Sequence, residues 1–399
     1  MNSTYYLDDK NENHLFIEIA KRINIISSFF FILSGLIGNF IIIFVFSQKR
    51  FRSNSSNVYL FILAINDSLI LIVHFFEEIV KNYERLFIHD DNLQINLSNN
   101  NTVSSFNALV LALNITDNYD LACRLINYLR YVLRFISAYV IVAFTIQRLI
   151  VVYLPLNNKF KTKSSAWSTT LLIVFASIFI NLWVLFMFEL KQSESFVYCD
   201  SNQNLNIEYM ILTIIYISLI MFIPISIVFI SNSIILFETR KSELLSRNAV
   251  SEHRSVQGNV RSLIIAEDEI KISDKREKIS EQTKPFYMNI NQIISRISHK
   301  SSDQKKLTKV FTLISLSFAF LNLPYFIAWI LFYYEYHFSR TAKESRLNYI
   351  NSFVKLTEIF YILNYGIHFW IYLATSSVFR QQLKYSCKFI VLFKAIYIN

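Results

Sequence analysis

The stretch that decides the fold is Cys123–Pro155, CRLINYLRYVLRFISAYVIVAFTIQRLIVVYLP. It is apolar over most of its length and yet carries arginines. Polar and apolar residues recur along it at steps of four, three, four, three and four, so they fall on one helical stripe: Arg130, Arg134, Ser137, Ile141, Phe144 and Arg148. An arginine in hydrocarbon costs about 3 kcal/mol or more. The sequence therefore predicts a membrane helix whose stripe faces a protein bundle or a wet cavity, where it serves both ligand binding and signal output.

The composition is that of a membrane protein. Of the 399 residues, 53% are hydrophobic, with 37 Phe and 23 Tyr. Crossing a bilayer takes about 20 apolar residues, and only helices pair every backbone polar group within lipid. We therefore expect an all-α bundle of seven transmembrane helices. The seven apolar runs lie at 23–47, 57–83, 120–152, 165–188, 207–237, 307–334 and 349–375.

Charges in the short loops predict the orientation. Lysines and arginines follow the first, third and seventh runs, and such residues mark cytoplasmic loops. They are Lys49, Arg50, Arg52, Lys159, Lys161, Lys163, Arg380, Lys384 and Lys388. The amino terminus is then expected outside, and the first run is expected to insert as its own anchor, because residues 1–22 do not resemble a cleavable signal. The formal net charge of +10 reflects this topology and the 238–306 loop rather than a nucleic-acid partner.

The same reading divides the chain into an extracellular amino terminus at 1–22, a seven-transmembrane domain at 23–375, and a short amphipathic helix 8 with a cytoplasmic tail at 376–399. Two loops inside the transmembrane domain are long. The 85–119 segment is polar and Asn-rich and is expected to be a flexible, glycosylated extracellular insertion. The 238–306 segment mixes charges with many serines and is expected to be a disordered cytoplasmic loop.

Asparagines in the outer segments head N-x-S/T triplets, the acceptor pattern for N-glycosylation. They are Asn2, Asn96, Asn100 and Asn114. Asn54 and Asn66 also fit the triplet but fall inside or within a span, so we expect them to stay unmodified.

The chain has three cysteines. Cys123 and Cys199 both lie in outer segments, where disulfides persist, and a bridge between them would tie the loop over the mouth of the bundle; two unpaired thiols are the alternative. Cys387 follows an amphipathic run and is either an S-palmitoylation site or a plain buried thiol.

Short motifs stand in order on the spans. They are Gly38-Asn39, Leu63-Ala64-Ile65-Asn66-Asp67, Cys123, Arg148 and Pro155, Pro224, Phe318 to Pro324, and Tyr372 followed by Phe379-Arg380. With these motifs the chain resembles the rhodopsin-like class of G-protein-coupled receptors over nearly its whole length. The resemblance implies a multi-pass plasma-membrane receptor, not an enzyme, that binds an extracellular ligand and activates a heterotrimeric G protein, with arrestin and a receptor kinase as further partners.

Several positions depart from the family pattern. Gln147 replaces the acid before Arg148, Leu321-Asn322 stands where Cys-Trp is usual, and His368-Phe369 where Asn-Pro is usual. The sixth-span Asn-Leu-Pro and the missing seventh-span proline resemble the divergent invertebrate neuropeptide receptors grouped with FMRFamide receptors. Because Gln147 carries no charge to hold the neighbouring arginine, the sequence also predicts ligand-independent signalling.

The resemblance assigns roles to individual residues. Arg148 is expected to couple to the G protein, the alternative being an arginine that only extends to the membrane interface. The residues expected to act in coupling and activation are Arg148, Pro224, Phe318, Asn322, Pro324 and Tyr372.

Asp67 is the centre of a predicted polar core inside the membrane. In the family the corresponding carboxylate can hold a sodium ion, the only cofactor that we expect; the alternative is a protonated, hydrogen-bonded carboxyl favoured by desolvation. Its expected partners are Asn39, Ser137, Asn364 and His368.

Charged residues in the outer halves of three spans predict a ligand site. They are Glu77, Glu78, Arg130, Arg134 and Glu358. Arg130 stands where amine receptors need an Asp, and Ile362 stands where an opsin needs its retinal lysine, which argues against both classes. Mixed charges around a wide mouth suit a peptide ligand, although the same groups could simply pair with one another, as buried charges usually must.

Other classes of protein fit less well. Transporters more often show repeated halves, and enzymes need a catalytic cluster that the spans do not show. The rival to a neuropeptide receptor is a chemosensory seven-helix receptor for small molecules, with divergent or absent G-protein coupling.

Overall fold

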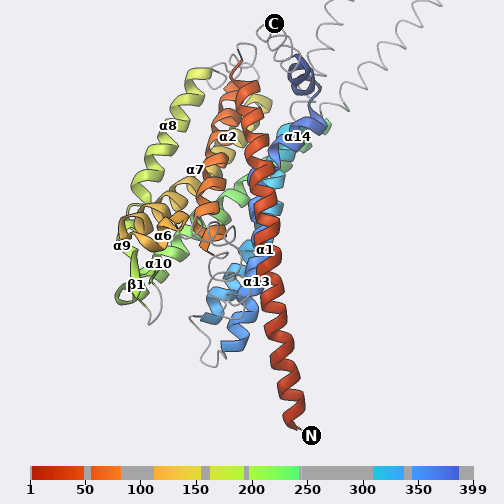
Figure 1. Ribbon diagram of the computed structural model, residues 1–399. Helices are drawn as coiled ribbons and strands as arrows, with labels where there is room; N and C mark the ends of the chain where they lie inside the picture. Colours follow the sequence, from red (N-terminus) through yellow and green to blue (C-terminus); the bar gives the residue numbers. More distant parts are fainter. Residues whose placement is uncertain are drawn as a thin grey trace, which may run out of the picture.

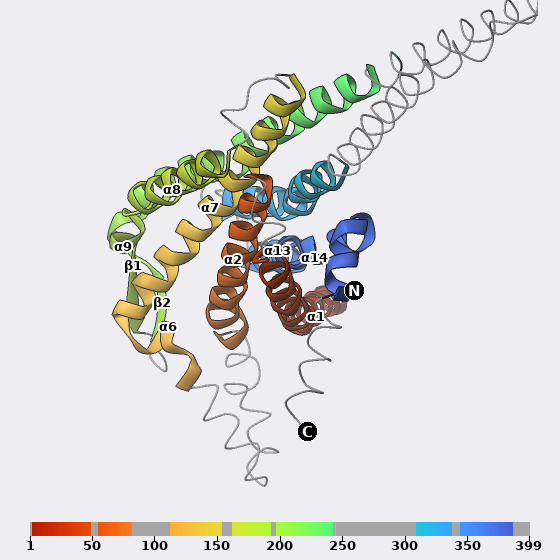
Figure 2. The ribbon, with the colours of Figure 1, turned by 90° about the horizontal axis from the view of Figure 1, so that it is seen from above.

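The computed structural model describes residues 2–48, 55–81, 112–153, 162–192, 197–241, 244, 309–336 and 344–385, with the backbone alone at 2–14, 203, 344 and 345. In this part of the chain, helices pack side by side into a bundle and two short strands cover one end (Figures 1 and 2). Six helices are long and apolar enough to cross a membrane. A further helix completes the predicted all-α seven-helix bundle, which is thereby confirmed.

The membrane-length helices follow the predicted runs. The first is α1 (Asn2–Phe46), which begins well before the predicted span; the second is α2 (Ser55–His74), continued by the π-helical η1 (Phe75–Val80). The third and fourth are α7 (Asp120–Tyr153) and α8 (Lys163–Ile180), the latter ending near the single turn α9 (Val184–Met187). The fifth runs over Asn206–Lys241 and contains α10 (Asn206–Ile217) and the π-helical η5 (Ser218–Phe222); the sixth is Lys309–Tyr336.

The seventh helix is built in two pieces, α13 (Glu344–Gly366) and α14 (His368–Thr375). Ile367 joins them, and its N–H donates to the carbonyl of Leu363 at 2.9 Å, so the bend keeps its backbone hydrogen bond. Ser376 then accepts a hydrogen bond from the N–H of Phe379 at 3.2 Å. That cap starts the predicted helix 8, which the structure describes over residues 377–385.

Close approach of α1 and α13 depends on two glycines. A Cβ added to Gly35 would lie 3.0 Å from the Cα of Gly366 and 2.8 Å from a methyl group of Leu71. Small residues let membrane helices approach closely and gain dispersion contacts. The seventh helix is thereby held beside the first, which brings its polar residues into the bundle.

Hairpin strands β1 (Phe188–Gln192) and β2 (Val197–Ser201) pair antiparallel, with Leu190 opposite Cys199. Figure 1 shows this hairpin with α6 (Ile115–Asn118) and α9 at one end of the bundle, and α14 toward the other. We call these the disulfide end and the Arg148 end. The predicted disulfide is present: Cys123 at the start of α7 is bonded to Cys199, with their Cα atoms 5.6 Å apart.

Part of the segment predicted to be a flexible insertion is in fact tied down. Asp117 of α6 accepts a hydrogen bond from the N–H of Cys199 at 2.8 Å and pairs with Lys81 at 3.2 Å. Asn114 is only 3% exposed, and its side-chain nitrogen lies 3.3 Å from a carboxylate oxygen of Asp117. The glycan predicted at Asn114 therefore has no room in this conformation.

Some predictions fall outside the described residues. These are the sequons at Asn96 and Asn100, the cysteine Cys387, most of the 85–119 insertion and most of the 238–306 loop; the side chain of Asn2 is likewise not described.

Candidate functional site

The predicted charge cluster at the disulfide end comes together, and most of it pairs internally. Arg130 of α7 forms an ion pair with Glu77 of η1. It also donates to the side-chain oxygen of Asn127, one turn away, at 2.7 Å. Two opposite charges that leave water together need this kind of geometry to offset their desolvation.

A second ionic group lies between η1 and α13. The ammonium of Lys355 lies 2.5 Å from Glu78 and 3.3 Å from Glu358, and Asn24 of α1 lies 3.4 Å from the same carboxylate oxygen of Glu358. Lys355 was missed in the sequence analysis. Its position three residues before Glu358 on one helix face was the available signal. Four of the five predicted ligand contacts are thus already paired with residues of the bundle.

Arg134 is the exception. Its guanidinium carbon lies 4.8 Å from the centre of the Tyr361 ring, and it makes no ion pair with any residue that the structure describes. Its Nε is buried without a hydrogen-bond partner. A cation–π contact offsets only part of the cost of burying a charge.

Arg134 also lines a cavity between α7 and the fifth and sixth helices. Half of its lining residues are aromatic: the lining consists of Tyr131, Arg134, Thr213, Tyr216, Ile217, Ile220, Met221, Tyr325, Phe326 and Trp329. The tyrosines are held in place, since the hydroxyl of Tyr216 donates to the carbonyl of Tyr131 at 3.0 Å and the ring of Tyr325 stacks on Tyr361 at 4.9 Å. A concave aromatic site with one convergent charged group is the usual form of a ligand pocket.

Deeper in the bundle, Asp67 is 0% exposed and contacts two of its predicted partners. Ser137 donates to one carboxylate oxygen at 3.2 Å, and Nδ1 of His368 lies 3.0 Å from the other. Asn39 donates instead to the carbonyl of Tyr365 at 3.0 Å, and both polar atoms of the Asn364 side chain lack a partner.

This arrangement does not fit the predicted sodium ion. At this distance a proton lies between Nδ1 of His368 and Oδ2 of Asp67, on one atom or the other, so this nitrogen is not available as a metal ligand.

At the opposite end of α7, Arg148 is held by aromatic rings. Its guanidinium carbon lies 3.8 Å from the centre of the Phe311 ring, on the sixth helix, and 5.8 Å from that of Phe144. Its Nε and Nη2 are buried without hydrogen-bond partners. The preceding Gln147 turns toward α2, where its amide donates to Ser55 at 2.8 Å and accepts from Ser56 at 3.3 Å.

The other residues predicted to act in activation lie on the fifth, sixth and seventh helices. Tyr372 packs against Phe46 and Phe379, with its hydroxyl unpartnered, and Asn322 donates to the carbonyl of Phe318 at 2.6 Å. Pro224 follows the π-helical turn η5, and Pro324 lies within the sixth helix.

Near Arg148, a hydrogen bond links the fifth and sixth helices. Asn232, which replaces the usual tyrosine, donates to the hydroxyl of Ser315 at 2.9 Å.

Comparison with known proteins identifies the family. No curated protein gives a significant match to the chain. The family model described as 7 transmembrane receptor (rhodopsin family) matches residues 102–372, which is more than half of the chain and spans both the Arg134 cavity and Arg148. Together with the bundle of membrane-length helices, this match shows that the chain is an integral membrane protein and belongs to the rhodopsin family of seven-transmembrane receptors.

Proposed function

We propose that this receptor binds an extracellular neuropeptide in the cavity at Arg134 and activates a heterotrimeric G protein at its Arg148 end. The observation that carries the proposal is that the buried Arg134 makes no ion pair with any residue in the described part of the chain. An anionic group of the ligand, either an acidic side chain or a terminal carboxylate, would form the ion pair that this arginine does not make with the described residues of the bundle.

The surroundings of the cavity support a peptide over an amine. An ammonium group would meet Arg134 with like charge, and the carboxylates nearby are engaged by Arg130 and Lys355. Tyrosine rings and hydroxyls line the cavity, and they suit the apolar and polar groups that alternate along a peptide. The resemblance of Asn322-Leu323-Pro324 to invertebrate FMRFamide-type receptors points to the same ligand class.

The orientation follows from the loop charges. We place the disulfide end and the amino terminus outside the plasma membrane and the Arg148 end in the cytoplasm. Arrestin and a receptor kinase then have access to the serine-rich 238–306 segment, where phosphates add strong negative charge.

A small-molecule chemosensory receptor is the second candidate, because one small carboxylate would also satisfy Arg134. A screen of a neuropeptide library beside a panel of small carboxylic acids, in cells with a promiscuous G protein and a calcium readout, separates the two. We expect agonists among the peptides. Agonists found only among the acids would replace the peptide with the second candidate.

Given a peptide agonist, Arg134→Gln should raise its EC50 by about tenfold or more, since a charge-assisted contact to a desolvated group is lost. Arg124→Gln is the matched control, because Arg124 lies on the same helix and pairs with Asp120 at 2.9 Å, outside the cavity. Both variants should reach the surface. Equal potency of the two variants would reject the contact with Arg134.

A further inference from the structure

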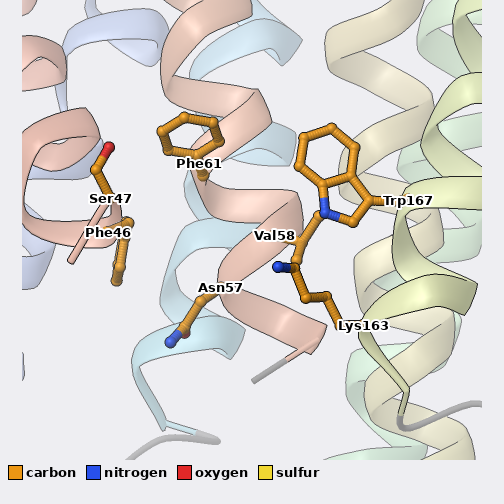
Figure 3. Close-up of a pocket in the computed structure, with 7 residues that line it drawn as sticks. All are labelled: Phe46, Ser47, Asn57, Val58, Phe61, Lys163 and Trp167. Carbon is orange, nitrogen blue, oxygen red and sulfur yellow. The ribbon is translucent and has the colours of Figure 1, made fainter. Parts of the chain in front are cut away.

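Two cavities at the Arg148 end of the bundle each contain a cation. Figure 3 shows the first, a groove in which Lys163 and Trp167 of α8 face residues of α2. Lys163 is exposed, so water can solvate its ammonium group. The second cavity lies between α7 and the fifth and sixth helices and is lined by Arg148, whose Nε and Nη2 are buried without hydrogen-bond partners. Because burying a charge without a partner is costly, the second cavity is the one that needs a ligand.

The two unpartnered nitrogens of Arg148 form one edge of its guanidinium group. Nε–H and one N–H of Nη2 point the same way in the plane of the group, so this edge is a pair of parallel donors. The face of the group is covered instead, because the centre of the Phe311 ring lies 3.8 Å from the guanidinium carbon. An anion can therefore approach in the plane and accept from both N–H groups while the ring contact stays intact.

The other polar residues of this cavity offer further donors. Thr145 and Ser315 donate their hydroxyl hydrogens to carbonyls of their own helices, at 2.7 and 3.0 Å. The hydroxyl of Thr312 makes no hydrogen bond with any residue that the structure describes. The amide nitrogen of Asn232 donates one hydrogen to Ser315 at 2.9 Å and carries a second. None of the described residues that line the cavity is acidic, so an anion would meet donors and no negative charge.

The size of the cavity limits the choice of anion. It has room for about one water molecule. A carboxylate or a phosphate group has several heavy atoms and is too large for this space. An anion of a single atom is only slightly larger than water, and the chloride ion is the common one in cells.

We propose that this cavity binds one chloride ion, held by Nε–H and Nη2–H of Arg148, with the Thr312 hydroxyl and the Asn232 amide as further donors. The ion neutralises the arginine where the described part of the bundle supplies no carboxylate. It also contacts α7, the fifth helix and the sixth helix at once, so its binding stabilises the packing of these three helices.

The test measures thermal unfolding of the full-length receptor, purified in detergent, in sodium chloride and in sodium gluconate at the same ionic strength. Gluconate is too large for the cavity. We expect the unfolding temperature to be about 3 °C higher in chloride, the shift for a ligand at about ten times its Kd. Bromide, which is also a single atom, should act like chloride.

Two pairs of variants locate the ion. Arg148→Gln should abolish the difference between the two salts. Arg134→Gln is its matched control and should keep the difference, because Arg134 is also an arginine of α7 with a buried, unpartnered Nε but lines another cavity. Thr312→Val removes a donor at nearly constant volume and should raise the chloride concentration needed by about fivefold. Thr357→Val, on α13 outside the cavity, should leave it unchanged.

Four results would overturn the proposal. Equal unfolding temperatures of the wild type in the two salts would mean that water fills the cavity. A salt difference that persists in Arg148→Gln would place the ion elsewhere, and one that only Arg134→Gln removes would place it in the Arg134 cavity. The threonine pair decides even if Arg148→Gln does not fold, since equal chloride dependence of Thr312→Val and Thr357→Val would also reject the site.

Discussion

Two arginines of α7, Arg130 and Arg148, are buried in opposite ways. Toward the disulfide end, Arg130 pairs with the carboxylate of Glu77 and with the side chain of Asn127. At the other end, Arg148 lies against the rings of Phe311 and Phe144, and two of its nitrogens have no hydrogen-bond partner. The same type of residue on one helix thus has an ionic environment at Arg130 and an aromatic one at Arg148.

The difference between the two contacts indicates what each of them does. A buried ion pair is strongly destabilised when one partner is lost, so the outer pair fixes α7 against α2. A cation–π contact is worth roughly 0.5–2 kcal/mol and can be broken at modest cost. The activation that we propose at the Arg148 end requires a contact between the third and sixth helices that can open, and the weaker kind of interaction allows this.

The largest effect is expected from removing the outer carboxylate. Glu77→Gln leaves Arg130 buried beside a neutral amide, which should cost about 3–5 kcal/mol of stability. The thermal unfolding temperature of the detergent-purified receptor and its surface expression should both fall clearly.

The control for this variant is the double substitution Glu77→Gln with Arg130→Gln. Because the double variant has neither charge, it should regain most of the stability that Glu77→Gln alone loses. If the double variant is as unstable as the single one, the ion pair is not what holds these helices together, and the contrast with Arg148 disappears.

A smaller effect is expected at the aromatic end. Phe311→Leu keeps an apolar side chain but removes the ring under Arg148, so the inactive arrangement should lose roughly 1 kcal/mol, or about fivefold in the ratio of active to inactive receptor. Basal second-messenger output at matched surface expression should rise accordingly.

Two further substitutions serve as controls for Phe311→Leu. Phe311→Tyr retains a ring and should leave basal output near the wild-type level. Phe320→Leu removes a ring from the same helix, but this side chain is 65% exposed on the bundle surface, so no change is expected. Similar basal output from all three variants would mean that Phe311 does not restrain Arg148.

The fold followed from the sequence because long apolar runs have few alternatives in a membrane. Even the seventh helix, which the pair Lys355 and Glu358 makes more polar than the rest, was located as an apolar run at 349–375. The short α6 was missed, because four residues carry little periodicity and its order depends on Asp117 contacting Cys199 and Lys81.

The site was predicted less completely, because pairing across helices is a property of their packing. Sequence spacing placed both outer arginines on one stripe, but it did not tell that Arg130 would pair with Glu77 while Arg134 would lie against the ring of Tyr361. The aromatic restraint on Arg148 was hidden for a similar reason. The family pattern directed attention to the missing acid at Gln147, whereas the contact comes from Phe311, 163 positions after Arg148.

The smallest effect is expected at Gln147 itself, where the family pattern suggests a large one. In the family an acid at this position holds the arginine that follows, and Gln147→Asp would restore it. Here the side chain points to Ser55 and Ser56 of α2 instead. An aspartate can accept hydrogen bonds from both hydroxyls, so it should stay largely on α2 and lower basal output by about twofold at most. Combining Gln147→Asp with Phe311→Leu completes a double-mutant cycle. Independent effects should add, because the amide and the ring contact different helices. A Gln147→Asp variant that abolishes basal output, and also cancels the rise caused by Phe311→Leu, would show that the ionic restraint of the family can dominate in this chain and that the ring is secondary.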